Sequence, residues 1–134
     1  QNPELRARFK AGGQGILPGV NLLAYEAMLA AYRDAGDWHA SLLRYLQGNR
    51  DYLFRELNVL PGIIMHPVEA TYLAWLDVSA LGLNDPAYFF ESHGLGMSGG
   101  GQYGADDHMR LNFGCPRAVL EEAVARFRAA LPRT

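Results

Sequence analysis

Helical spacing of apolar residues dominates the first half of the chain. An N-capping Asn2 before a proline predicts a short helix, which the glycine cluster at 12–15 ends. Residues 20–33 contain no helix breaker and are apolar on nearly all sides, which predicts a helix that needs two packing partners. A third helix is predicted from Asp37, because apolar residues recur at helical spacing from there to Leu57.

Strand signals and short helix signals alternate in the second half of the chain. β-Branched and aromatic residues predict strands over 63–66 and 71–76, and strict alternation of apolar and polar residues predicts another over 108–113. A capping residue before a proline predicts a short helix over 87–93, and Pro116 predicts the start of the last helix. The order of these elements predicts an α+β fold, a two-layer sandwich. In it, long helices precede a small, mostly antiparallel sheet that has helices packed on one side.

The alternating segment carries the strongest chemical signal in the chain. Met109, Leu111 and Phe113 fall on one face of the predicted strand, and Arg110 falls on the other. A guanidinium presents a planar pair of donors that matches a carboxylate, and a strand holds that pair better than a loop does. Arg110 is therefore a candidate carboxylate receptor, and a structural ion pair or a charge on an edge strand is the alternative.

Composition and charge remove several classes of function. The 134 residues carry a formal net charge of −2, so the chain lacks the excess of positive charge that binding to nucleic acid or to an anionic membrane surface requires. No apolar run approaches the length that crosses a bilayer, and the four histidines show no metal-ligand spacing. Cys115 is the single cysteine, so no internal disulfide forms, and a cytoplasmic location is predicted. The chain begins at Gln1 rather than at a methionine, which predicts a piece of a larger protein.

Two segments and the glycine-rich stretch between them show a resemblance to a known family. The sequences ATYLAWLD over 70–77 and MRLNFGCPR over 109–117, together with residues 2–6 and 48–50, resemble the C-terminal part of fold-type I pyridoxal-phosphate enzymes. The chain is most similar to the cystathionine β-lyase-like MalY/PatB branch of the class I and II aminotransferases. The resemblance extends over nearly the whole chain and is most specific around Arg110.

This resemblance implies a two-part layout and a cofactor. Residues 1–15 would be the tail of a large domain and a hinge, and residues 16–134 would be the small domain of a homodimeric, cytoplasmic enzyme. The parent protein would use pyridoxal 5′-phosphate to act on an amino-acid substrate, as an aminotransferase or as a carbon–sulfur β-lyase. Lys10 is the only lysine and lies in a polar helix beside the hinge, so the Schiff-base lysine is expected upstream. The chain alone is therefore expected neither to bind the cofactor nor to be active.

The resemblance also implies the candidate site. Arg110 would grip the α-carboxylate of the substrate, and residues 97–104 would form a flexible loop beside it, with a plain connector between strands as the alternative. Asn112 lies on the same strand face, and Ser98 and Tyr103 lie in the loop. These three residues are candidates to line the substrate pocket, and roles in turns or packing are the alternative.

Two other functions fit the same residues. A free-standing module would hold a small carboxylate with Arg110 and the glycine loop without chemistry, and a dimerisation domain would be built on the apolar helix over 20–33. A GxGxxG match at 94–99 does not predict a dinucleotide site, because a predicted helix precedes it and further glycines follow it. An upstream domain with a Ser/Thr-flanked lysine would select the enzyme over both alternatives.

Overall fold

The computed structural model describes residues 2–16 and 19–131 of the chain. The chain divides after Ala40 into two compact units, which differ in how far they bury their side chains. The predicted boundary after residue 15 concerns the domains of a longer protein, and it stays a prediction.

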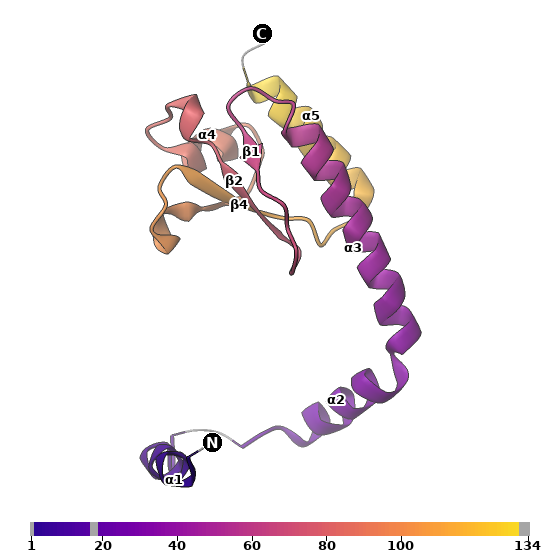
Figure 1. The fold of residues 1–134 in the computed structure, drawn as a ribbon, viewed down its shortest axis with the longest axis vertical. Helices are drawn as coiled ribbons and strands as arrows, with labels where there is room; N and C mark the ends of the chain where they lie inside the picture. The colour runs from indigo at the N-terminus through magenta and orange to yellow at the C-terminus, as the bar shows by residue number, and fades with distance from the viewer. Residues whose placement is uncertain (1, 17–18, 132–134) are drawn as a thin grey trace. The chain divides into compact units, whose positions relative to one another are not determined.

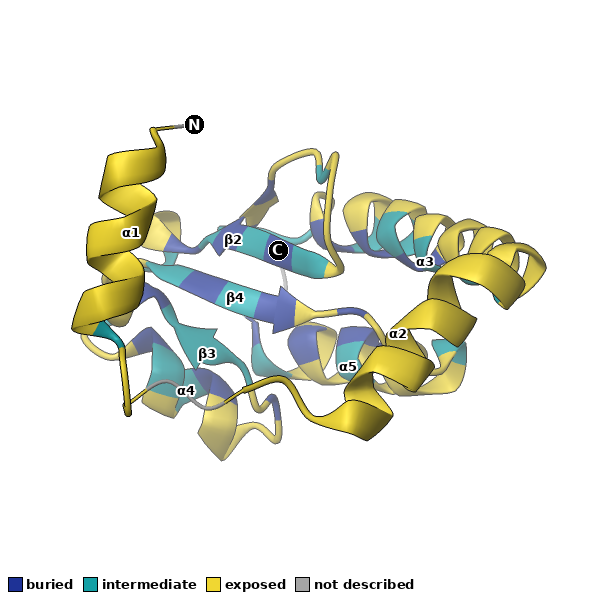
Figure 2. Ribbon diagram, turned by 90° about the horizontal axis from the view of Figure 1, so that it is seen from below, coloured by how far each residue is buried: buried dark blue, intermediate teal, exposed yellow. Residues whose placement is uncertain are grey.

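The first unit consists of helices. Their bounds are α1 Pro3–Gly12 and α2 Leu22–Asp34, and α3 Gly36–Leu57 begins in this unit (Figure 1). Asn2 and Asn21 cap α1 and α2, because each side-chain oxygen accepts a backbone N–H from the first turn, at 2.9 and 2.8 Å. No described residue of α1 or α2 is buried, and Figure 2 shows both helices almost wholly exposed. The two packing partners expected for the helix over 20–33 are thus not found within this unit.

The second unit is built on a four-stranded antiparallel sheet with the order β1–β2–β4–β3. The strands are β1 Ile64–Met65, β2 Leu73–Asp77, β3 Ser98–Gly99 and β4 His108–Asn112. The register places Trp75 of β2 and Ser98 of β3 on either side of Arg110 in β4. Strand β2 begins two residues later than predicted, because Thr71 adopts a φ of 69°, which is incompatible with an extended chain.

Helices α3 and α5, the latter spanning Arg117–Ala130, cover one face of this sheet (Figure 1). Ala74 and Leu76 of β2 and Met109 and Leu111 of β4 are buried, whereas the residues between them are half-buried. The helices add to this core the buried residues Leu53, Leu57, Leu120, Val124 and Phe127. The two-layer α+β architecture predicted from the sequence is confirmed.

Three short helices complete the second unit: η1 Ser79–Leu81, α4 Pro86–Ser92 and η2 Gly100–Tyr103. Asp85 caps α4, because its carboxylate accepts the backbone N–H of Tyr88 at 2.9 Å. Helix α4 lies beside β3 (Figure 2), and the ring of its Phe90 lies 5.4 Å from that of Phe127. This aromatic pair joins α4 to the core beneath α5.

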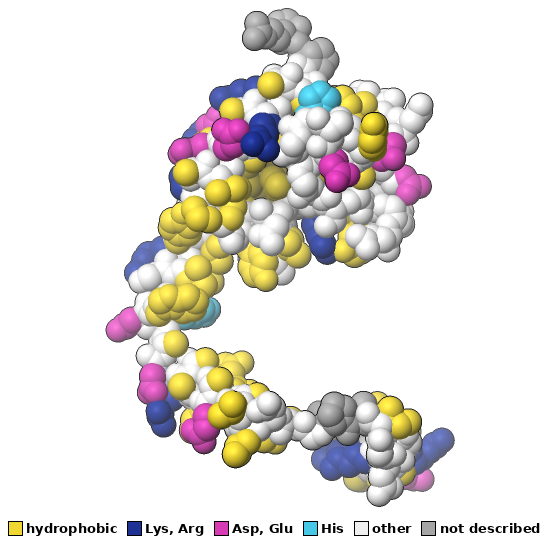
Figure 3. All heavy atoms as spheres, turned by 180° about the vertical axis from the view of Figure 1, so that it is seen from behind, with side chains coloured by type: hydrophobic (Ala, Val, Ile, Leu, Met, Phe, Trp, Pro, Cys, Tyr) yellow, Lys and Arg dark blue, Asp and Glu magenta, His cyan; other side chains and the backbone are white. Residues whose placement is uncertain are grey.

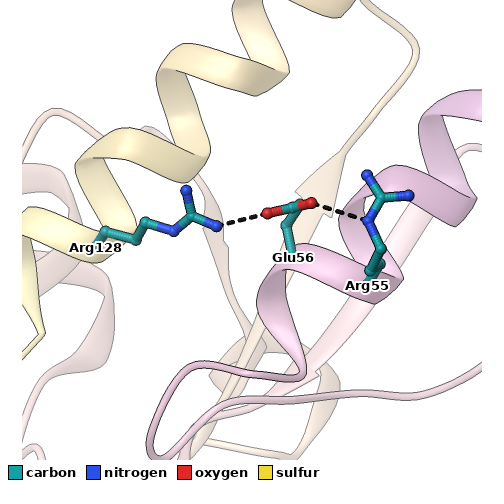
Figure 4. A network of polar contacts seen from close by, with 3 residues as sticks. All are labelled: Arg55, Glu56 and Arg128. Atoms are coloured by element: carbon teal, nitrogen blue, oxygen red, sulfur yellow. Dashed lines mark hydrogen bonds and ion pairs between the residues drawn. The ribbon is translucent and has the colours of Figure 1, made fainter. Parts of the chain in front are cut away.

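Polar side chains tie α3 to the rest of the second unit. Asn49 is fully buried, and its Nδ2 donates to the carbonyl oxygens of Phe113 and Cys115 at 3.0 and 2.9 Å. Near the end of α3, Glu56 accepts a hydrogen bond from Arg128 of α5 (Figure 4). The turn that follows β4 and the helix that follows the turn are therefore both anchored on α3.

Candidate functional site

Arg110 lies in the middle of β4, on the sheet face opposite the buried Met109 and Leu111. Its neighbours in the adjacent strands are Trp75 of β2 and Ser98 of β3, so the side chain rises from the interior of the sheet and not from its edge. The side chain is half-buried in this position. The orientation predicted from the alternation at 108–113 is confirmed, because successive side chains of a strand point to opposite faces.

The guanidinium of Arg110 contacts two hydroxyl groups. Its Nη1 donates to the hydroxyl of Tyr103, and its Nη2 donates to Oγ of Ser98 at 3.2 Å. The guanidinium carbon also lies 5.1 Å from the centre of the Tyr103 ring. No ion pair joins Arg110 to a carboxylate in the part of the chain that the structure describes. The charge is thus positioned by neutral groups, which leaves it free to attract an anion.

An aromatic group lies next to this arginine. The ring of Trp75 meets that of Tyr103 edge-on at 5.8 Å and stacks on that of His108 at 5.5 Å. The Nδ1 of His108 is 2.7 Å from a carboxylate oxygen of Asp107. Sequence reasoning did not single out Trp75 or His108. The alternation of side chains along strands could have identified them. His108 is two residues before Arg110 on β4 and Trp75 is opposite Arg110 on β2, so all three side chains lie on the same face of the sheet.

Asn112 is exposed and has no described hydrogen bond to Arg110. Its side-chain oxygen accepts the backbone N–H of Gly114 at 2.8 Å, which shapes the turn after β4. The structure therefore brings Ser98 and Tyr103 to Arg110 but leaves Asn112 in contact with its own turn. The role of these residues in lining a substrate pocket stays a prediction.

The segment expected to be a flexible loop over 97–104 has regular structure. Its first part forms the edge strand β3, and its second part forms the 3-10 helix η2. Gly100 allows this compact turn, because a Cβ there would lie 2.2 Å from the carbonyl oxygen of Ala105 and 2.7 Å from that of His108. Gly104 ends the turn with a φ of 81°. The expected loop is therefore a turn fitted closely against β4.

Two titratable groups near the sheet have shifted pKa values. Hydrogen bonds from the hydroxyl and backbone N–H of Ser79 lower the pKa of Asp77, which keeps this carboxylate ionised. Burial raises the pKa of the Cys115 thiol, which disfavours the thiolate. Cys115 is therefore a poor nucleophile in this environment. Among residues 2–16 and 19–131, no group of histidine, cysteine or acidic side chains is arranged to hold a metal ion.

Lys10 decides whether this chain offers a site for pyridoxal phosphate. Such a site needs an enclosed lysine, a partner for the pyridine nitrogen and donors for the phosphate. Lys10 is exposed in the last turn of α1, a helix without a buried residue. The described residues around Lys10 do not fit the cofactor. Within the described ranges, no helix is both long and apolar enough to cross a membrane.

Comparison with known proteins identifies the family. A sequence profile described as aminotransferase class I and II matches residues 10–127, so the chain belongs to this family. The cystathionine β-lyase PatB of Bacillus subtilis (strain 168) is 36% identical over 133 residues. The aligned region covers 94% of this chain and 34% of PatB. The family resemblance seen in the sequence is confirmed.

Solved structures share the fold of the chain. The crystal structure of OvoB superimposes with a TM-score of 0.95 at 50% identity, covering 99% of this chain and 35% of OvoB. The PLP-bound C–S lyase from Staphylococcus hominis superimposes with a TM-score of 0.85 at 30% identity, covering 99% of this chain and 36% of the lyase. The chain spans about a third of the length of the proteins that it matches.

Proposed function

We propose that this chain is the substrate-carboxylate-binding domain of a pyridoxal-phosphate-dependent carbon–sulfur β-lyase or aminotransferase. The observation that carries the proposal is the environment of Arg110, which is half-buried on a central strand, contacts two hydroxyls and has no described ion-pair partner. A guanidinium has five N–H groups, and these two contacts use one on each terminal nitrogen. Three N–H groups therefore remain for a ligand, which is enough for a bidentate carboxylate.

Arg110 acts in this proposal by binding and orienting the substrate. Paired N–H···O bonds to the α-carboxylate would fix the amino acid in one orientation, so that one bond of the α-carbon is presented for cleavage. Its guanidinium serves as a hydrogen-bond donor and not as an acid or a base. The cofactor would be held by parts of a longer protein, since the residues around Lys10 do not fit it.

The relatives favour one of the two reactions. PatB is named a cystathionine β-lyase, and the structure from Staphylococcus hominis is named a C–S lyase, which supports cleavage of a carbon–sulfur bond. The profile match to aminotransferases keeps amino-group transfer as the second candidate. Assembly as a homodimer in the cytoplasm belongs to the same proposal.

The full-length protein that carries this chain tests the proposal. Arg110→Ala is expected to raise the KM for the amino acid and to lower kcat/KM about 100-fold, as the loss of a bidentate ionic pair would. Arg110→Lys is expected to recover only part of this loss, because an ammonium cannot present two coplanar donors. Release of thiol and ammonia identifies the lyase, and transfer of the amino group to an added 2-oxo acid identifies the aminotransferase.

Arg44→Ala is the matched control, because Arg44 is exposed on α3 and its one described partner is the hydroxyl of Ser41. This control is expected to leave the kinetics unchanged. Unchanged kinetics of a folded Arg110→Ala variant would show that Arg110 does not bind the substrate. Binding of carboxylates without turnover of any amino acid would instead favour the non-catalytic binding module.

A further inference from the structure

Tyr103 approaches the Arg110 guanidinium in two ways. Its hydroxyl accepts a hydrogen bond from Nη1, and its ring lies 5.1 Å from the guanidinium carbon, within the range of a cation–π contact. Ser98 accepts from Nη2 at 3.2 Å. Both terminal nitrogens therefore have hydrogen-bond partners in the segment that contains β3 and η2, and these contacts restrain the side chain.

The Tyr103 ring is itself supported. Trp75, which pairs with Arg110 across β2 and β4, meets the Tyr103 ring edge-on at 5.8 Å. Trp75 is supported in turn by its stack on His108 at 5.5 Å. A hydrogen bond of 2.7 Å to Asp107 restrains the His108 ring. These contacts thus connect His108 of β4, through Trp75 and Tyr103, to Arg110 on the same strand.

The backbone that carries Tyr103 is also restrained. Tyr103 ends η2, whose first residue, Gly100, lies too close to the carbonyl oxygens of Ala105 and His108 to tolerate a Cβ. Half of the Tyr103 side chain is exposed, so burial alone does not hold it. The turn packed against β4 and the contact with Trp75 therefore place the hydroxyl and the ring on the guanidinium.

We infer that Tyr103 is a positioning residue for Arg110, with Trp75 as its support. This inference rests on the proposed function of Arg110. An arginine side chain that is already held in its binding orientation loses less rotamer freedom when a carboxylate binds. Tyr103 thereby strengthens the binding of the substrate carboxylate without contacting the reacting bond. It acts equally on bound substrate and transition state, so its contribution appears in KM and not in kcat.

Tyr103→Phe in the full-length protein removes the hydroxyl and keeps the ring. The KM for the amino acid is expected to rise about fivefold with kcat unchanged. This rise is smaller than the one expected when a fully buried hydrogen bond to a charged group is lost. The dissociation constant of an unreactive monocarboxylate analogue is expected to rise by the same factor. Tyr103→Ala also removes the ring and is expected to raise both constants about 30-fold.

Tyr88→Phe is the matched control, because Tyr88 is an exposed tyrosine of α4 whose hydroxyl has no described contact. Trp75→Phe is expected to raise KM about twofold, because a smaller ring supports Tyr103 less well. Thermal unfolding of each variant shows that it is folded. The Nε–H signal of Arg110 in an NMR spectrum provides a readout apart from activity, and it is expected to broaden or shift in Tyr103→Phe but not in Tyr88→Phe.

The changes in KM and kcat of Tyr103→Phe distinguish a positioning role of Tyr103 from its other possible roles. A lower KM in Tyr103→Phe would show that the hydroxyl competes with the substrate carboxylate, and an unchanged KM would show that Tyr103 only packs. A fall in kcat at constant KM would place Tyr103 in the chemistry. Each of these results overturns the inference while Arg110→Ala still weakens binding. If Arg110→Ala itself has no effect on binding, the proposed function fails first.

Discussion

Helices α2 and α5 have almost the same length, 13 and 14 residues, yet they relate to their surroundings in opposite ways. Helix α2 is the more apolar of the two, and none of its residues is buried. Helix α5 carries charged residues on one side and buries Leu120, Val124 and Phe127 on the other. An apolar composition therefore does not by itself bury a helix. A stripe of apolar residues on one side does, because it matches a single partner surface.

The same contrast holds between the two units of the chain. The whole described core lies after Ala40, whereas the helices before it expose large apolar side chains. Figure 3 shows apolar side chains gathered on the surface of α2. Surfaces of this kind on soluble proteins mark contacts with another partner. The first unit therefore exposes large apolar side chains, whereas the second buries its apolar side chains in a core.

Self-association of the chain is the largest effect that this contrast predicts. The apolar surface of α2 is expected to hold two copies together at a chain concentration of about 100 μM. A dissociation constant of that size corresponds to an association free energy of about −5.5 kcal/mol. Light scattering measures the mass directly. Leu22→Glu combined with Leu29→Glu is expected to give monomers, and Val119→Glu on α5 is the control. A strictly monomeric chain would show that the exposed leucines of α2 do not form an interface between copies.

Matched leucines test the difference in burial between the units. Leu53→Ala removes a side chain that is 0% exposed and is expected to lower the free energy of unfolding by about 3 to 4 kcal/mol. Leu23→Ala removes one that is 76% exposed and is expected to change it by less than about 0.5 kcal/mol. Urea unfolding of both variants gives the comparison. Equal losses would mean that α2 packs into the core.

Matched asparagines test the polar side of the contrast. Asn49→Ala leaves the buried carbonyls of Phe113 and Cys115 without their donor and is expected to cost about 2 to 3 kcal/mol. Asn21→Ala removes the cap of α2 and is expected to lower the helical circular dichroism signal without moving the midpoint of urea unfolding. A stable Asn49→Ala variant would indicate that water replaces the amide.

The smallest effect concerns the ion pairs of Glu56 (Figure 4). Hydrogen bonds from Arg55 and Arg128 lower the pKa of Glu56, so the folded state favours the ionised carboxylate. The resulting stability is present above the ordinary glutamate pKa of about 4.3 and is lost as pH falls through the lowered value. Glu56→Gln is expected to make the unfolding free energy depend less steeply on pH below about 4.

Glu121→Gln on the exposed side of α5 is the control for this measurement, because the structure describes no ion pair for Glu121. Identical pH profiles for the wild type and Glu56→Gln would show that the contacts in Figure 4 do not persist in solution.

Local signals in the chain were sufficient to predict most of the elements. The caps at Asn2 and Asp85 and the proline before α5 mark helix starts within a few residues, because capping depends on neighbours in the sequence. The alternation around Arg110 predicted which way its side chain points, because strands repeat every two residues. The start of β2 was misplaced, because the φ of Thr71 is not encoded in β-propensity.

Contacts between distant segments could not be derived in this way. Trp75 and Tyr103 meet beside Arg110 because β2 and β3 both pair with β4, and the register of those pairs sets which residues are opposite. Asn49 donates to carbonyls 64 and 66 residues later in the chain, a pairing that no local pattern contains. Side-chain periodicity is a property of the local backbone and is readable from sequence. The partners of a side chain depend on how strands and helices pack, and packing is a property of the whole domain.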